Sequence, residues 1–186
     1  MAAEPFVSIV VPTTGNVGYI RGMVKSVARL DYPRDRFELI LLGDAETPLL
    51  QRARELAQEG GIALQVIHDP VAAGEKRNRG VAAAQGEYIA FTDDDTILRE
   101  DWLRATVQHL AQNPDYAGVG GPNFTPREGL PFAKAVGRIF GSKFLFRFRY
   151  TAGHDEPCEV DHNPTCNYVL RREAVAGIGF HPTLWP

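Results

Sequence analysis

The chain has 186 residues, of which 44% are hydrophobic and 23% are charged, so it is long enough and apolar enough to fold around a core. Its 20 basic and 23 acidic residues leave a formal net charge of -3, which provides no overall attraction for nucleic acid, and we expect no such partner. Two cysteines are too few for a disulfide framework. Because residues 1–5 lack a signal-peptide pattern and no apolar run suits a spanning helix, we expect a cytoplasmic protein.

Strand and helix patterns alternate along the first part of the chain. Apolar runs predict strands over residues 6–11, 37–42, 62–67 and 88–91, and the first of these is predicted to be buried on both faces. Apolar residues at three- and four-residue spacing predict helices over 17–30, 49–57, 76–85 and 102–110. Since parallel strands need crossover helices, we expect one α/β domain over residues 1–186, with a doubly wound, mostly parallel sheet flanked by helices.

Beyond residue 116 the alternation gives way to loops rich in glycine and proline, before a further strand over 166–170 and a short helix. In sheets of this kind, ligands bind at the carboxyl ends of the strands. The candidate ligand-binding residues are therefore the polar ones that follow the predicted strands: Thr13, Thr14, Asp44, His68, Asp69 and Asp93 to Asp95.

The sharpest local signal is the run of three acids, Asp93, Asp94 and Asp95. If the strand continued through them, Asp93 and Asp95 would share one face of the sheet. Adjacent carboxylates repel one another, and a divalent cation relieves that repulsion; hard oxygen ligands favour Mg²⁺ or Mn²⁺. The alternative is a solvated acidic group before the helix at residue 102.

Three segments in this order resemble family-2 glycosyltransferases of the GT-A fold. They are SIVVPTTGN at residues 8–16, GEKRNRGVAAAQGEYIAFTDDDTILREDWL at 74–103 and CNYVLRREAVAGIGF at 166–180. The resemblance covers most of the chain and rests on the order and spacing of the segments. It implies a GT-A, Rossmann-like fold.

The resemblance assigns roles to the three acids. Asp93 matches the first acid of the family's D-x-D motif, which is associated with the ribose and pyrophosphate of the donor. Asp95 matches the acid that binds the metal, so the resemblance implies Mn²⁺ or Mg²⁺ as cofactor. Asp94 stands at the variable middle position and is counted with the donor-binding residues.

The resemblance also assigns roles to residues outside the acidic run. Pro12 and Thr13 match the turn after the first strand, which borders the base and ribose, and Arg77 matches a basic residue of the nucleotide pocket. Relatives often end the second strand in two acids, whereas this chain has Gly43 followed by Asp44. We expect Asp44 to take part in donor binding, and the identity of the base stays open.

The resemblance implies an enzyme that moves a sugar from a nucleotide-sugar donor to a hydroxyl of a saccharide or lipid-linked acceptor, assisted by the metal and with inversion. Two alternatives remain open at this point. One is a sugar nucleotidyltransferase, which the lack of a basic residue between Pro12 and Arg21 disfavours. The other is a non-catalytic module that binds nucleotide sugars or a membrane surface.

The catalytic base of such enzymes follows the segment that corresponds to residues 171–180, but no acid occurs after Glu173. Three residues of the preceding loop are alternative bases: Glu159, Asp161 and His162. A general base must reach the acceptor hydroxyl, and nothing in the spacing of these residues requires that they do. We expect a domain that is incomplete at its C-terminus, with the base beyond Pro186.

Two further patterns lie between residues 132 and 166. Phenylalanines alternate with basic residues over 132–150, which predicts either a helix that covers the sheet or a peripheral contact with the inner face of the membrane. His154, Cys158, His162 and Cys166 recur every four residues, as zinc ligands on a helix would. Intervening prolines make a continuous helix improbable, so we expect no zinc site.

Overall fold

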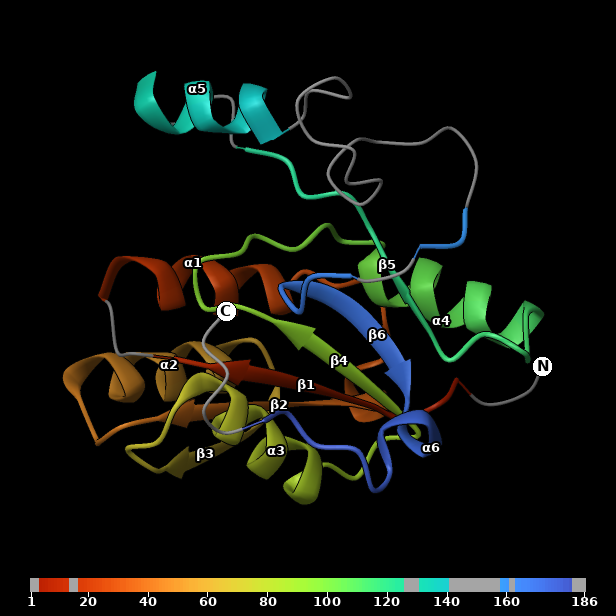
Figure 1. The fold of residues 1–186 in the computed structure, drawn as a ribbon. Helices are drawn as coiled ribbons and strands as arrows, with labels where there is room; N and C mark the ends of the chain where they lie inside the picture. Colours follow the sequence, from red (N-terminus) through yellow and green to blue (C-terminus); the bar gives the residue numbers. More distant parts are fainter. Residues whose placement is uncertain (1–3, 14–16, 126–130, 141–157, 161–162, 182–186) are drawn as a thin grey trace.

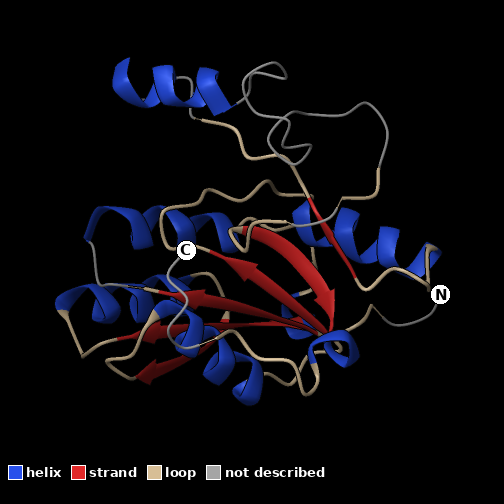
Figure 2. Cartoon of the chain, in the orientation of Figure 1, coloured by secondary structure: helices blue, strands red, loops and turns tan. Residues whose placement is uncertain are grey.

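The computed structural model describes residues 4–13, 17–125, 131–140, 158–160 and 163–181, and these form a sheet covered by helices on both faces (Figures 1 and 2). The strands are β1 (Val7–Pro12), β2 (Phe37–Gly43), β3 (Ala63–His68), β4 (Tyr88–Thr92), β5 (Gly118–Gly120) and β6 (Asn167–Arg171). The helices are α1 (Val17–Val27), α2 (Pro48–Glu59), α3 (Ala73–Ala83), α4 (Trp102–Gln112), α5 (Pro131–Phe140) and α6 (Arg172–Val175), with a 3-10 turn at Arg34–Arg36.

The sheet has the strand order β3-β2-β1-β4-β6-β5. The four strands β1 to β4 run parallel, whereas β6 pairs antiparallel with both β4 and β5. The predicted doubly wound, mostly parallel α/β sheet is confirmed. The short β5 was not predicted, because Gly118, Val119 and Gly120 form no apolar run and are paired only through β6.

Alternate residues of the central strands enter two cores. Val7, Ile9 and Val11 of β1 belong to the larger core, which buries the apolar residues of α1, α2 and α4. Val10 belongs to the smaller core on the opposite face, against α3 and the segment around α6. The helices therefore cover both faces, as expected of strands that are apolar along their whole length.

The predicted helix over 17–30 ends early, at Val27. The guanidinium of Arg34 donates hydrogen bonds to the carbonyls of Val27 and Ala28, which are among the last acceptors of α1. Leu30 is nevertheless buried, only 3% exposed, so its apolar character reflects core packing after the helix has ended.

Only the first part of the segment 132–150 is described, as α5, which stands clear of the sheet in Figure 1. Phe132 on its first turn is 80% exposed, so the predicted helix covering the sheet is wrong at this residue. Residues 141–150 lie outside the described part of the chain. In the described residues, no helix has both the length and the apolarity needed to cross a membrane.

Candidate functional site

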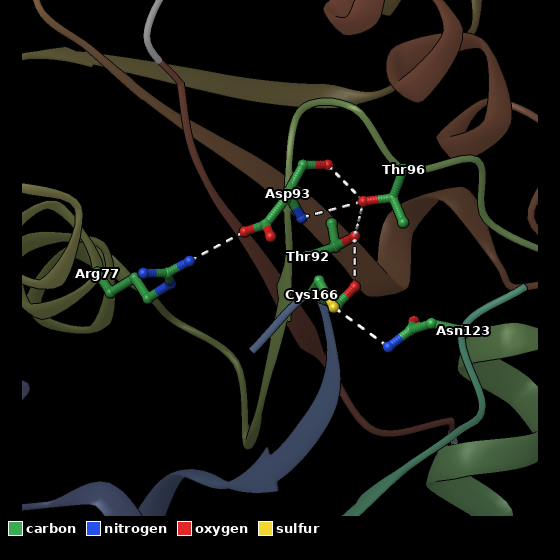
Figure 3. Close-up of polar contacts among 6 residues, drawn as sticks. All are labelled: Arg77, Thr92, Asp93, Thr96, Asn123 and Cys166. Carbon is green, nitrogen blue, oxygen red and sulfur yellow. Dashed lines mark hydrogen bonds and ion pairs between the residues drawn. The ribbon is translucent and has the colours of Figure 1, made fainter. Parts of the chain in front are cut away.

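The three acids lie in a turn immediately after β4, which ends at Thr92. The Thr96 N–H donates to the Asp93 carbonyl over 3.2 Å, and the Thr96 hydroxyl donates to the same oxygen over 2.6 Å (Figure 3). The Asp93 N–H in turn donates to Thr96 Oγ1 over 3.1 Å. Because β4 has already ended at Thr92, the condition under which strand alternation would place Asp93 and Asp95 on one face is not met.

Asp93 is paired with Arg77 of α3. The distance from Arg77 Nη2 to Asp93 Oδ1 is 2.9 Å, and the side chains are 12% and 36% exposed (Figure 3). The guanidinium also lies over the ring of Phe180, with 5.8 Å between Cζ and the ring centroid. Arg77 Nε is buried and has no hydrogen-bond partner within the described residues. A buried donor of this kind costs free energy unless a ligand or water accepts from it.

The middle acid, Asp94, is held by the end of β1. The hydroxyl of Thr13 donates to Asp94 Oδ2 over 2.5 Å, and the Thr13 N–H donates to the carbonyl of Leu42 on β2 over 2.8 Å. Thr13 is 2% exposed, and Pro12 before it is the buried last residue of β1. Pro12 and Thr13 therefore lie at the carboxyl end of β1, as predicted. The hydrogen bond from Thr13 to Asp94 joins this end of β1 to the acidic turn.

Asp44, which follows β2, is paired with Lys76 of α3. Lys76 Nζ lies 2.5 Å from Asp44 Oδ1 and donates to the Thr13 carbonyl over 2.9 Å. The side chain of Lys76 is 4% exposed and that of Asp44 is 51% exposed. A lysine ammonium is buried only when such partners replace its water. Lys76 therefore links the ends of two strands: it donates to the Thr13 carbonyl after β1 and pairs with the half-exposed carboxylate of Asp44 after β2.

Two consecutive cations, Lys76 and Arg77, thus stand in the first turns of α3, each opposite a carboxylate. The N-terminal end of a helix carries partial positive charge, so cations there are unfavourable without anionic partners. Asp44 and Asp93 supply these partners from the ends of β2 and β4. The N-terminal part of α3 therefore contacts the residues that follow β2 and β4, where the sequence predicts that the donor binds.

Asp95 is exposed, and the structure gives its side chain no hydrogen bond or ion pair within the described residues. Those residues contain no cluster of three His, Cys, Asp or Glu side chains that could enclose a metal ion. Mg²⁺ usually binds through one or two carboxylates together with water and substrate phosphates, so a free carboxylate in a turn suits it. The residues present fit a cation shared with a diphosphate.

A second group of contacts joins this turn to β6. The Thr92 hydroxyl donates to the Cys166 carbonyl over 3.1 Å and lies 2.9 Å from Thr96 Oγ1, while Asn123 Nδ2 donates to Cys166 Sγ over 3.3 Å (Figure 3). Burial, and then the negative charge of Asp93, raise the pKa of the Cys166 thiol. Cys166 is thereby kept in its neutral form beside the acids.

The remaining candidates lie at the outer end of β3 or outside the site. His68 Nε2 is 2.8 Å from Glu46 Oε2, and Asp69 pairs with Arg79 of α3. Thr14, His154, Asp161 and His162 lie outside the described residues. Of the described members of the zinc and base sets, Cys158 and Glu159 are exposed.

Sequence reasoning missed three residues that organise the site: Lys76, Asn78 and Thr96. Lys76 was placed on a predicted helix without a role, since lysines are rarely buried. The Asn78 amide makes two hydrogen bonds to the backbone of Phe180, a contact across 102 positions that no local pattern indicates. Thr96 carried a weak signal, since a threonine soon after a strand often closes a turn through its hydroxyl.

Comparison with known proteins identifies the family of this chain. The model of the glycosyl transferase family 2 matches residues 8–179. TuaG of Bacillus subtilis, named as a teichuronic acid biosynthesis glycosyltransferase, is 26% identical over 137 residues, which are 72% of this chain and 53% of TuaG. TarS of Staphylococcus aureus, a poly(ribitol-phosphate) beta-N-acetylglucosaminyltransferase, is 27% identical over 99 residues, which are 52% of this chain and 17% of TarS.

Solved structures agree in fold. The mannosyltransferase PcManGT from Pyrobaculum calidifontis, in complex with GDP-Man and Mn²⁺, superposes with a TM-score of 0.67 at 22% identity, covering 97% of this chain and 48% of that one. Residues 1–349 of TarS with UDP-GlcNAc give a TM-score of 0.66 at 20% identity, covering 92% and 47%. The fold is that of GT-A glycosyltransferases, and the chain spans about half the length of these proteins. Because the family model matches nearly the whole chain, the chain belongs to glycosyl transferase family 2.

Proposed function

We propose that this chain binds a nucleotide-sugar donor at the carboxyl ends of β1, β2 and β4 and serves the transfer of its sugar to an acceptor hydroxyl. The observation that carries the proposal is the presence of two groups suited to an anion and its cation: Arg77, which is paired with Asp93, and Asp95, which lies two residues further along the same turn. Arg77 holds a buried Nε donor without a partner in the described residues, and Asp95 presents an exposed carboxylate. An anion with a bound cation satisfies both, and the diphosphate of a nucleotide sugar is such a ligand.

The donor-binding residues we propose are those that the sequence indicated: Pro12, Thr13, Asp44, Arg77, Asp93 and Asp94. Within this set, we propose that Arg77, which is paired with Asp93, binds the diphosphate. Asp44, whose side chain is half exposed, is proposed to bind the nucleoside. The Thr13 hydroxyl donates to Asp94, so the proposed contribution of these two residues is to hold the acidic turn against the end of β1.

We propose Mn²⁺ or Mg²⁺ as the cofactor, with Asp95 as its protein ligand. When bound, the cation offsets the negative charge that develops on the departing nucleoside diphosphate. Arg77 stabilises the same charge from its fixed position beside Asp93, because a guanidinium accommodates phosphate oxygens through several N–H groups at once. PcManGT, solved with GDP-Man and Mn²⁺, shares the fold, which supports a nucleotide sugar and a divalent cation as the ligands of this chain.

In the proposed reaction the acceptor oxygen attacks the anomeric carbon, the bond from that carbon to the diphosphate oxygen breaks, and a base takes the acceptor proton. Attack from the face opposite the leaving group inverts the anomeric centre. The acceptor is a hydroxyl of a saccharide or of a lipid-linked sugar. We assign the base to no described residue: Glu159 is exposed with no contact that orients it.

We also propose a peripheral contact with the inner face of a membrane through residues 132–150. Phe132 and Lys134 of α5 are exposed, and Phe132 keeps 80% of its surface open. An aromatic ring and a cation on the same exposed helix turn suit the boundary between lipid headgroups and acyl chains.

Calorimetric titration with UDP and GDP, each with and without Mn²⁺, tests the proposed function. We expect one or both diphosphates to bind only with the cation, and Asp95→Asn to weaken that binding about tenfold or more, since it loses the ligand charge. The matched control is Asp115→Asn, an exposed aspartate between α4 and β5. Binding that is unchanged by Asp95→Asn, or independent of Mn²⁺, would contradict the metal assignment.

A further inference from the structure

Asn78 and Phe180 form a clamp between α3 and the segment that follows α6. Asn78 Nδ2 donates to the Phe180 carbonyl over 2.9 Å, and the Phe180 N–H donates to Asn78 Oδ1 over 2.7 Å. One side-chain amide thus satisfies both polar groups of one backbone residue. Gly74 allows the close approach, because a Cβ there would lie 3.3 Å from the Cβ of Phe180.

The clamp orients the ring of Phe180. The ring meets Phe91 of β4 edge to face, with centroids 5.4 Å apart and an interplanar angle of 89°. Phe91 is completely buried, so it gives the ring a rigid support. The Arg77 guanidinium also contacts the ring, with its Cζ 5.8 Å from the centroid. Attraction between a cation and an aromatic face is strongest where water is excluded, and Arg77 is mostly buried.

Arg77 is therefore fixed by two independent contacts, the Phe180 ring and the Asp93 carboxylate, while its Nε points to neither as a hydrogen-bond donor. A long side chain that is already ordered loses less conformational entropy when a ligand binds. Within the described residues, the Asn78 side chain makes no hydrogen bond to the residues assigned to the donor; its bonds go to Phe180 and Glu75. Its effect on the donor-binding residues passes through Phe180.

We propose that Asn78 is a positioning residue: by fixing the backbone of Phe180, it holds the Phe180 ring against Arg77 and so presets the guanidinium for the diphosphate. The inference rests on the proposed function, in which Arg77 faces the diphosphate. It links donor binding to the segment after α6, so that any displacement of Phe180 weakens the grip on the donor.

The test combines two variants with two measurements. Asn78→Ala removes the clamp, and Phe180→Leu keeps an apolar side chain but removes the aromatic face. Asn113→Ala is the matched control, because Asn113 Nδ2 makes a comparable 2.8 Å bond to the carbonyl of His109 near the end of α4. The measurements are the affinity for UDP and GDP with Mn²⁺, and the exchange rate and chemical shift of the Arg77 Nε–H by NMR.

We expect Asn78→Ala and Phe180→Leu each to weaken diphosphate binding about tenfold, to speed exchange of the Arg77 Nε–H and to shift its resonance, while Asn113→Ala changes neither. In the background of Arg77→Ala, Asn78→Ala is expected to cause no further loss of affinity, since both act through one contact. A general loss of structure would instead weaken binding by the same factor in both backgrounds.

Several outcomes overturn the inference. Wild-type affinity in Asn78→Ala, an unchanged Arg77 Nε–H signal in both variants, or full additivity with Arg77→Ala each contradicts a positioning role. If Asn78→Ala does not fold, Phe180→Leu decides the matter through the same two measurements. Failure of the wild-type chain to bind either diphosphate overturns the proposed function itself, which is a different result from binding that the variants leave intact.

Discussion

Replacing Lys76 with methionine should destabilise the fold measurably, because Lys76 is 3% exposed and its ammonium joins two strand ends. Methionine fills the space of the aliphatic stem but cannot donate to the Thr13 carbonyl, which Lys76 Nζ reaches over 2.9 Å. A hydrogen bond from a charged donor contributes about 1.5–3 kcal/mol. The ion pair with Asp44 adds about 1 kcal/mol or less, because half of the Asp44 side chain is exposed and takes up water.

The expected loss is about 1.5–4 kcal/mol, which for a chain of this length lowers the melting temperature by roughly 3–16 °C. Urea denaturation followed by circular dichroism measures it, with Lys25→Met on the exposed side of α1 as the control, expected to change stability by less than about 0.5 kcal/mol. Asp44→Asn should cost less than Lys76→Met. If Lys76→Met matches the Lys25 control, or if Asp44→Asn costs as much as Lys76→Met, the carbonyl bond is not the main contribution.

Three further predictions concern Ser8, Cys166 and the segment 132–150. Ser8→Ala should cost about 1–3 kcal/mol in urea denaturation, because its hydroxyl oxygen accepts from two backbone N–H groups after α3; a loss below about 0.5 kcal/mol would contradict this. Burial raises the pKa of Cys166, so at pH 8 it holds less thiolate and should react with iodoacetamide more slowly than exposed Cys158, as peptide mass spectrometry can show; equal rates would refute it. Reversing Arg147 and Arg149 to Glu should abolish weak, salt-sensitive sedimentation with anionic vesicles, and no change would remove the membrane proposal.

The parts of the fold that sequence alone predicted are those with local causes. Strands buried on both faces must be apolar along their length, and this pattern located β1, β2 and β4. An apolar run also located β3, although its residues are exposed or half-buried at the edge of the sheet. Helix ends were harder to predict, because contacts from later segments occur there, such as the hydrogen bonds from Arg34 to the carbonyls at the end of α1. The short β5 has no pattern of its own and exists through its pairing with β6.

The candidate site divides in the same way. The location of the site at the carboxyl ends of the strands was predictable, and so were its acids, because polar residues follow the apolar strands there. The direction of each carboxylate was not, because Asp93 and Asp94 lie in a turn and face Arg77 and Thr13 from other elements. The role of Asn78 could not be predicted for the same reason, since its hydrogen-bond partner Phe180 is 102 positions away in the sequence.

The central claim is that Arg77 and Asp95 receive a diphosphate and its cation, and one measurement tests it most directly. Crystals grown with Mn²⁺ and the better-binding diphosphate, UDP or GDP, should show an anomalous manganese peak at the Asp95 carboxylate and a phosphate oxygen accepting from the Arg77 Nε–H. Diphosphate bound elsewhere, or bound here with Arg77 Nε still unpartnered and no manganese at Asp95, would contradict the account.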